Sequence, residues 1–160
     1  MFPLSIKWRG ARGEVKEAAM KIVIGSDHGG YKLKEEIKAY LKRRKISFKD
    51  LGAYSEESVD YPDTGKKVAK AVASKKGKFG ILVCGTGLGM SMVANKVKGI
   101  RAALCHNVYT AKMSRAHNDA NILCLGGRVL KKALALKIVD AFLQTQFEGG
   151  RHLRRVKKIG

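Results

Sequence analysis

Short apolar runs alternate with amphipathic segments from residue 20 onward, and this alternation limits the choice of fold more than any other feature. The run 79–84 is continuously apolar, which is typical of a strand buried on both faces. Strands that alternate with helices pair in parallel through right-handed crossovers. We therefore predict an α/β fold, a Rossmann-like three-layer α/β/α sandwich with a five-stranded parallel sheet. The expected strands are 21–25, 46–48, 79–84, 100–105 and 121–125.

The segments between these runs have the apolar periodicity of helices. Leu33, Ile37 and Leu41 fall four residues apart, so they share one helical face. The basic tail 149–160 has no such order, and we expect it to be irregular. The other expected helices are one opened by Pro62, one ending near Lys96, one over 108–117 and a long one around 134–142.

The length of 160 residues suits one compact domain. Met20 immediately precedes the first expected strand. We therefore divide the chain into an N-terminal extension, 1–19, of unknown role and a domain over 20–160. The extension mixes acidic and basic residues without a sustained apolar stretch, so it makes a poor secretory signal.

The charge is strongly positive, with 33 Lys and Arg against 13 Asp and Glu and a formal net charge of +20. Such an excess favours anionic partners, which include nucleic acid, acidic membrane surfaces and phosphorylated substrates. The basic residues are dispersed and accompany no nucleic-acid-binding motif, and no apolar stretch reaches the ~18 residues of a membrane span. We therefore expect no nucleic acid and no membrane as partners. The sign of the charge alone does not identify a substrate, and a solvated basic surface has the same composition.

The three cysteines, Cys84, Cys105 and Cys124, are widely spaced. No Cys-x-x-Cys or Cys/His cluster has the spacing of metal ligands, so no structural zinc is expected. An odd number of cysteines without a disulfide framework suits a reducing cytoplasm. Cys105 and Cys124 have the context of small core residues.

Polar clusters follow the expected strands at their carboxyl ends, where ligands bind in open α/β sheets. Asp27-His28 follows the first strand, 84–91 the third and Gly126-Gly127-Arg128 the fifth, while the helix after the fourth strand ends in His117-Asn118-Asp119. This repeated placement indicates one binding site built from several loops.

The glycine-rich run Gly85-Thr86-Gly87-Leu88-Gly89 joins a buried strand to a helix. Such a run brings backbone N–H groups close to an anion, although a ligand-free turn or a nucleotide cradle remains open. The spacing lacks the ending of a P-loop and is a weak dinucleotide signal. Cys84 favours the anion site, because a thiol at a helix start is readily held as a reactive thiolate. Thr86 adds a hydroxyl within reach of the same ligand.

The remaining polar residues have two interpretations each. Asp27-His28 is either a capping pair or a binder of sugar hydroxyls, and His117-Asn118 is either a helix ending or a proton shuttle with its neighbour. Arg151 and its neighbours in the tail either hold a phosphate through guanidinium forks or contact solvent or nucleic acid.

Seven motifs in order closely resemble the type B ribose-5-phosphate isomerases, over roughly residues 20–160. They are Ser26-Asp27-His28-Gly29-Gly30, Ser58-Val59-Asp60-Tyr61-Pro62, Cys84-Gly85-Thr86-Gly87-Leu88-Gly89, Ala94-Asn95-Lys96, Gly99-Ile100-Arg101-Ala102, Ser114-Arg115-Ala116-His117-Asn118-Asp119-Ala120-Asn121 and Glu148-Gly149-Gly150-Arg151-His152.

The resemblance implies interconversion of ribose 5-phosphate and ribulose 5-phosphate through a cis-enediolate, without a cofactor. It assigns catalysis to Cys84 as the base, Thr86 beside the enediolate, His117 in ring opening and Asp27 at a sugar oxygen. The substrate-binding residues that it implies are His28, Tyr61, Gly85, Gly87, Gly89, Asn118, Arg128, Arg151 and Arg155. It also implies a homodimer or homotetramer whose sites combine two subunits, so Cys84 and His117 of one chain can serve different sites.

Position 90 places the chain within one branch of that family. A second branch lacks the cysteine and has a glutamate base six positions later, where this chain has Met90. The alternative function is isomerisation of a six-carbon phosphosugar such as allose 6-phosphate or galactose 6-phosphate, since close relatives act on these. A nucleic-acid-binding module and a nucleotide-binding regulator are the alternatives from other classes. The dispersed Lys and Arg disfavour the first, and the second does not account for Cys84 and the paired arginines.

Overall fold

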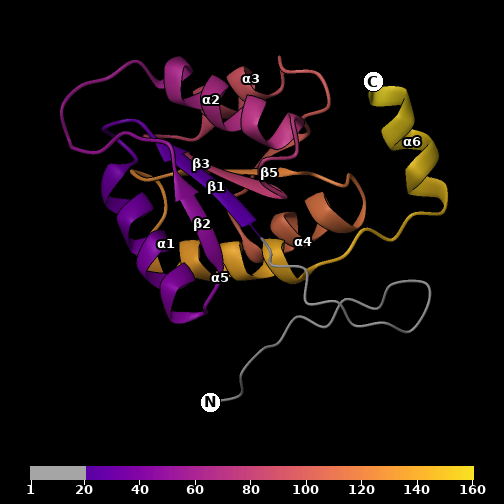
Figure 1. Cartoon of the computed structure of the whole chain (residues 1–160). Coiled ribbons are helices and arrows are strands. Elements are labelled where there is room, and N and C mark those ends of the chain that lie inside the picture. Colours follow the sequence, from indigo (N-terminus) through magenta and orange to yellow (C-terminus); the bar gives the residue numbers. More distant parts are fainter. Residues whose placement is uncertain (1–20) are drawn as a thin grey trace.

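The computed structural model describes residues 21–160, so the extension predicted over 1–19 lies outside the described residues. Five parallel strands form one sheet in the order β2-β1-β3-β5-β4 (Figure 1). The predicted Rossmann-like sandwich with a five-stranded parallel sheet is confirmed. The strands are β1 (Lys21–Ser26), β2 (Ser47–Asp50), β3 (Phe79–Cys84), β4 (Ala102–Leu104) and β5 (Ile122–Gly126).

Helices cover both faces of the sheet. In Figure 1, α2 and α3 lie above the sheet, α1, α4 and α5 lie below it, and α6 stands to one side. No helix among residues 21–160 is long and apolar enough to cross a membrane. The helices are α1 (Tyr31–Arg43), α2 (Tyr61–Ala73), α3 (Leu88–Ala94), α4 (Val108–Ala116), α5 (Lys132–Gln144) and α6 (Arg151–Ile159).

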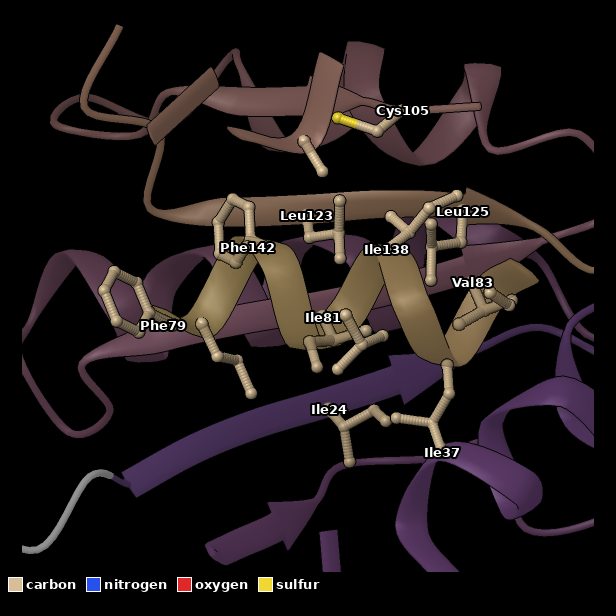
Figure 2. Close-up of a cluster of buried hydrophobic side chains, with 14 of the residues drawn as sticks. Ile24, Ile37, Phe79, Ile81, Val83, Cys105, Leu123, Leu125, Ile138 and Phe142 are labelled. Atoms are coloured by element: carbon tan, nitrogen blue, oxygen red, sulfur yellow. The ribbon is translucent and has the colours of Figure 1, made fainter. Parts of the chain in front are cut away.

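Two apolar cores lie on the two faces of the sheet, because successive side chains of a strand point to opposite sides. Ile81 and Val83 of β3 belong to the core beneath the sheet, together with Ile138 and Phe142 of α5 (Figure 2). Leu82 and Cys84 belong to the core under α2 and α3. The central strand is thus buried on both faces, as its unbroken apolar sequence predicts.

The strand order creates a switch point between β1 and β3. From β1 the chain moves outward to β2, whereas from β3 it moves in the other direction toward β4 and β5. Loops after strands that diverge in this way leave a crevice at the carboxyl edge of the sheet. The loops that begin at Asp27 and Gly85 therefore border the expected ligand position.

The tail differs from its prediction, because residues 151–159 form the helix α6 and are not irregular. His152 and Val156, four residues apart, are the buried positions of α6, and its remaining positions are exposed. Two apolar-facing positions are a weak periodic signal among five Lys and Arg, which is why the tail was predicted as irregular. The structure also ends α3 at Ala94, slightly before the predicted end.

Candidate active site

The sulfur of Cys84 lies at the carboxyl end of β3, under a tight turn. The backbone N–H of Gly87 donates a hydrogen bond to Cys84 Sγ at 3.1 Å. Gly87 has φ +81°, a conformation that favours glycine. A Cβ atom there would lie 2.5 Å from the Leu104 side chain and 2.9 Å from the Leu125 carbonyl carbon. Gly87 is the N-cap of α3, so the N–H that faces the sulfur belongs to the start of this helix, where the sequence places Cys84.

The turn after β1 packs directly on this loop. The backbone N–H of Asp27 donates to Val83 O at 3.2 Å, and the buried Asp27 carboxylate accepts from the N–H of Gly30 at 3.0 Å. A Cβ atom at Gly30 would lie 2.3 Å from Val83 O. Gly30 and the Asp27 carboxylate thus hold the β1 turn against the end of β3. Asp27 does not cap α1, because the N-cap is Gly30 and no side chain caps it; its carboxylate closes the turn that precedes the helix.

Arg128 joins the same group from the loop after β5. Its backbone N–H donates to Gly85 O at 3.0 Å. Its guanidinium lies over Gly29 and Gly85, because Cβ atoms at these positions would lie 3.4 Å from Arg128 Cζ and 3.3 Å from Arg128 Nη1 respectively. A cation therefore lies over the loops that follow β1 and β3.

His28, Tyr61 and Thr86 complete this group. His28 Nδ1 accepts a hydrogen bond from the N–H of Val59 at 3.2 Å, so in the neutral ring Nε2 carries the proton. The Tyr61 ring packs over Gly89, where a Cβ atom would lie 2.7 Å from the ring. Thr86 is exposed, and its Oγ1 accepts from the N–H of Leu88 at 3.3 Å. We name this set the cysteine group: Asp27, His28, Tyr61, Cys84, the 85–89 loop and Arg128.

His117 lies near the amino ends of the strands, at the end of the sheet opposite to Cys84. It caps α4, five residues before β5 begins at Ile122, which pairs with Gly80 near the start of β3. Cys84 stands at the other end of β3, about 16 Å from Phe79 at roughly 3.3 Å per residue. Within one chain, His117 is therefore separated from Cys84 by nearly the length of the strand.

His117 has partners of its own at that edge. Its ring stacks on that of His152, with centroids 4.2 Å apart and planes at 10°. Glu148 Oε2 lies 3.9 Å from His117 Nε2 and 3.5 Å from His152 Nε2. The exposed Arg151 is adjacent to His152 in α6. We name the histidine group as His117, Asn118, Glu148, Arg151, His152 and Arg155.

Asn118, Arg151 and Arg155 are all exposed. The Asn118 carbonyl accepts from Arg101 Nε at 3.1 Å, which fixes the backbone beside His117. Sequence reasoning did not assign a role to Glu148 or His152. The sequence signal that could have identified them is the four-residue spacing of Glu148 and His152. This spacing was not used because the tail was predicted as irregular.

The donor atoms of His117, Glu148 and His152 lie within 4.8 Å of one another and form the candidate metal-binding set among residues 21–160. The lone pair of an imidazole nitrogen lies in the plane of its ring. Two rings stacked at 10° therefore do not direct their lone pairs to one point between them. The arrangement as it stands does not fit a metal ion.

Known proteins are similar to this chain over most of its length. A model of the family described as ribose/galactose isomerase matches residues 22–159. Ribose-5-phosphate isomerase B of Escherichia coli K12 is 50% identical over 139 residues, which cover 87% of this chain and 93% of the relative.

Solved structures agree with the sequence matches. Ribose-5-phosphate isomerase B of Clostridium thermocellum has a TM-score of 0.87 at 62% identity and covers 88% of this chain and 95% of its own. The enzyme of Mycoplasma genitalium, solved with bound ribulose-5-phosphate, has a TM-score of 0.83 at 47% identity, with 87% and 93% covered. The chain therefore belongs to the ribose/galactose isomerase family.

Proposed function

We propose that the protein interconverts ribose 5-phosphate and ribulose 5-phosphate, with Cys84 as the base that moves the proton. The carrying observation is the Cys84 sulfur, which receives the Gly87 N–H at 3.1 Å at the switch point of the sheet. Relatives that are 50% and 62% identical have the name ribose-5-phosphate isomerase B. The protein is accordingly an aldose–ketose isomerase.

The proton moves between two adjacent carbons of the open-chain sugar. The Cys84 thiolate takes the proton from C2, the electron pair forms the C1–C2 double bond, and O1 gains the negative charge. Backbone N–H groups of the 85–89 loop stabilise this enediolate, because fixed donors act most strongly where charge develops. Thr86 assists them. A proton passes from O2 to O1, the thiol returns its proton to C1, and the C2 carbonyl forms.

The charged and polar residues of the two groups bind the phosphate and the sugar oxygens of the substrate. His28 and Arg128 bind the phosphate from the cysteine group, and Arg151 and Arg155 add guanidinium forks from the histidine group. Asp27 and Asn118 contact sugar oxygens, and Tyr61 lines the pocket beside Gly89.

The active site combines two subunits of a homodimer or larger homo-oligomer. His117, which opens the furanose ring, and Cys84 stand at opposite edges of the sheet of one chain, so one chain does not present both to one sugar. A two-fold axis that places the histidine group of one subunit beside the cysteine group of its partner creates two complete sites at once.

The isomerase domain comprises residues 20–160, and we assign no role to 1–19. We place the protein in the cytoplasm, where Cys84 stays reduced. Its three cysteines are free, as this location requires.

The test is a Cys84→Ala variant assayed with ribose 5-phosphate. We expect kcat to fall by at least ~10², the scale of general acid–base catalysis. The matched control is Cys105→Ala, which removes another buried thiol outside both groups and should leave kcat within about twofold of wild type. Near-normal turnover of the Cys84→Ala protein would remove Cys84 as the base.

A six-carbon phosphosugar is the second candidate, because the family description includes galactose isomerase. The exposed segment 54–60 leads to Tyr61 and offers the position where pocket length can change. Comparison of kcat/KM for ribose 5-phosphate, allose 6-phosphate and galactose 6-phosphate decides between them. A higher value for either hexose phosphate would overturn the pentose assignment.

A further inference from the structure

The stacked imidazoles of His117 and His152 share one carboxylate, that of Glu148. We propose that Glu148 and His152 are positioning residues, which hold the His117 ring in the orientation and protonation state that ring opening requires. This inference rests on the proposed function, in which His117 acts on the furanose ring. It concerns two side chains to which the proton-transfer step gives no part.

The backbone between Glu148 and His152 is built to bring the second ring onto the first. The N–H of Glu148 donates to Ala116 O at 3.0 Å, which fixes this segment to the end of α4. Gly149 and Gly150 then have φ of +69° and +55° and lead into α6, whose N-cap is Gly150. No atom lies within 4 Å of a Cβ atom built at either glycine. They are required for their backbone conformation, not for lack of space.

The two rings differ in exposure, and this difference separates their roles. The His117 side chain is 38% exposed, whereas that of His152 is 10% exposed. A sugar therefore reaches His117, while His152 supports it from the side of the protein. The near-parallel stack at 4.2 Å limits rotation of the His117 ring about its χ2 angle.

The charges around the pair oppose double protonation. Desolvation lowers the pKa of His152, and the charges of His117, Arg151 and Arg155 add to this effect, while Glu148 acts in the other direction. The carboxylate therefore favours a proton on His152, and a protonated His117 disfavours it.

The other carboxylate near the end of α4 is already engaged. Asp119 Oδ1 accepts from Arg115 at 3.0 Å, and Asp119 Oδ2 lies 3.3 Å from Arg101 Nη2. Glu148 is therefore the acid that faces the two rings among the residues that the structure describes.

The experiment measures the pH dependence of kcat/KM with ribose 5-phosphate for Glu148→Gln and His152→Asn. Ring opening needs an unprotonated imidazole to accept the proton of the anomeric hydroxyl, so activity falls as the pair takes up protons. Loss of the Glu148 charge should move this acid limb to lower pH, and loss of the His152 ring should move it to higher pH. We expect shifts of roughly 0.5 unit or more in opposite directions.

The opposite directions of the two acid-limb shifts distinguish a positioning role from a merely structural one. A merely structural role would lower the rate of both variants and leave the acid limb where it is in wild type, which would overturn the inference. Glu36→Gln is the matched control, because Glu36 is a half-exposed carboxylate 2.7 Å from Lys132 and lies outside both groups. Its acid limb and kcat should equal those of wild type.

Failure of the inference is distinguishable from failure of the proposed function. If wild type isomerises ribose 5-phosphate and Cys84→Ala does not, the function stands whatever the acid limbs show. If the melting temperatures of both variants match wild type and their profiles are unshifted, Glu148 and His152 do not position His117.

Discussion

Lys34 Nζ lies 2.9 Å from Asp50 Oδ1, although the Lys34 side chain has no exposed surface. The same ammonium donates to the carbonyl of Ala53, and Asp50 Oδ1 also accepts from the N–H of Gly52 at 2.9 Å. This ion pair fixes the segment that follows β2. In that segment, the Gly52 carbonyl accepts a hydrogen bond from the N–H of Ser26. The buried lysine thereby supports the end of β1, where the Asp27 turn begins.

The Asp50→Ala variant should unfold at a much lower urea concentration than wild type. It leaves Lys34 fully buried without its counter-ion, and breaking such a pair costs about 3–5 kcal/mol. Glu35→Ala is the control, since Glu35 is a partly exposed partner of Lys38 and should contribute less than about 1 kcal/mol. Urea unfolding followed by circular dichroism gives both values, and equal values would contradict the assigned role.

Acid should destabilise the protein through the same carboxylate. Burial alone would raise the pKa of Asp50, but hydrogen bonds from Lys38, the Gly52 N–H and Lys34 outweigh burial and hold it below its ordinary value. The resulting stability is present above pH ~4 and is lost as pH falls through the lowered pKa. An Asp50→Asn variant should show a weaker fall in melting temperature below pH 4 than wild type. An identical pH dependence would exclude Asp50 as its source.

Gly87 and Gly99 allow a matched comparison that tests the turn over Cys84. Their φ values are +81° and +86°, but only Gly87 has neighbours within 4 Å of a Cβ atom. Gly99→Ala should therefore cost the ~1–2 kcal/mol of a left-handed backbone alone. Gly87→Ala should cost about 1–3 kcal/mol more from overpacking and should also lose activity, since it displaces the N–H that faces Cys84. Equal losses in thermal unfolding would mean that the Gly87 turn relaxes freely.

His117→Asn should affect the two directions of the reaction unequally. Ribose 5-phosphate is mainly a closed furanose, whereas ribulose 5-phosphate has its C5 oxygen esterified and stays open. Loss of a ring-opening group should lower forward kcat/KM by about 10²–10⁴ and should leave proton transfer from the ketose. Exchange of the C1 proton of ribulose 5-phosphate with deuterated water, measured by NMR, should persist. Loss of exchange would place His117 in the proton-transfer step itself.

A mixture of two inactive variants tests the shared site. Refolded together, Cys84→Ala and His117→Asn chains form hybrid dimers in which one site has both defects and the other has none. With random pairing, activity should return to about a quarter of the wild-type value. Each variant refolded alone is the control. Continued inactivity of the mixture would mean that Cys84 and His117 act within one chain.

The sequence was informative where a pattern is local and repeated. The apolar run 79–84 was sufficient to predict a central buried strand, and the cysteine group follows from loops that leave adjacent strands at one edge. The pairing of His117 with His152 could not be predicted, because it depends on the positive-φ backbone of Gly149 and Gly150, which leads into α6. The Gly87 N–H on Cys84 is likewise a property of the folded turn, not of the motif.

Successive side chains of β3 point alternately into the two cores, so the face on which position 84 lies depends on the number of residues before it. The Cys84 side chain points to the layer of α2 and α3 because position 84 comes three positions after Ile81 of the other core, and an odd step along a strand changes the face. Insertion of one residue within 79–83 would turn the thiol toward α5 and bury it among aliphatic side chains. Insertion of two would return it to its own face. The position of the thiol is thus constrained by the number of residues in a strand that is buried along its whole length.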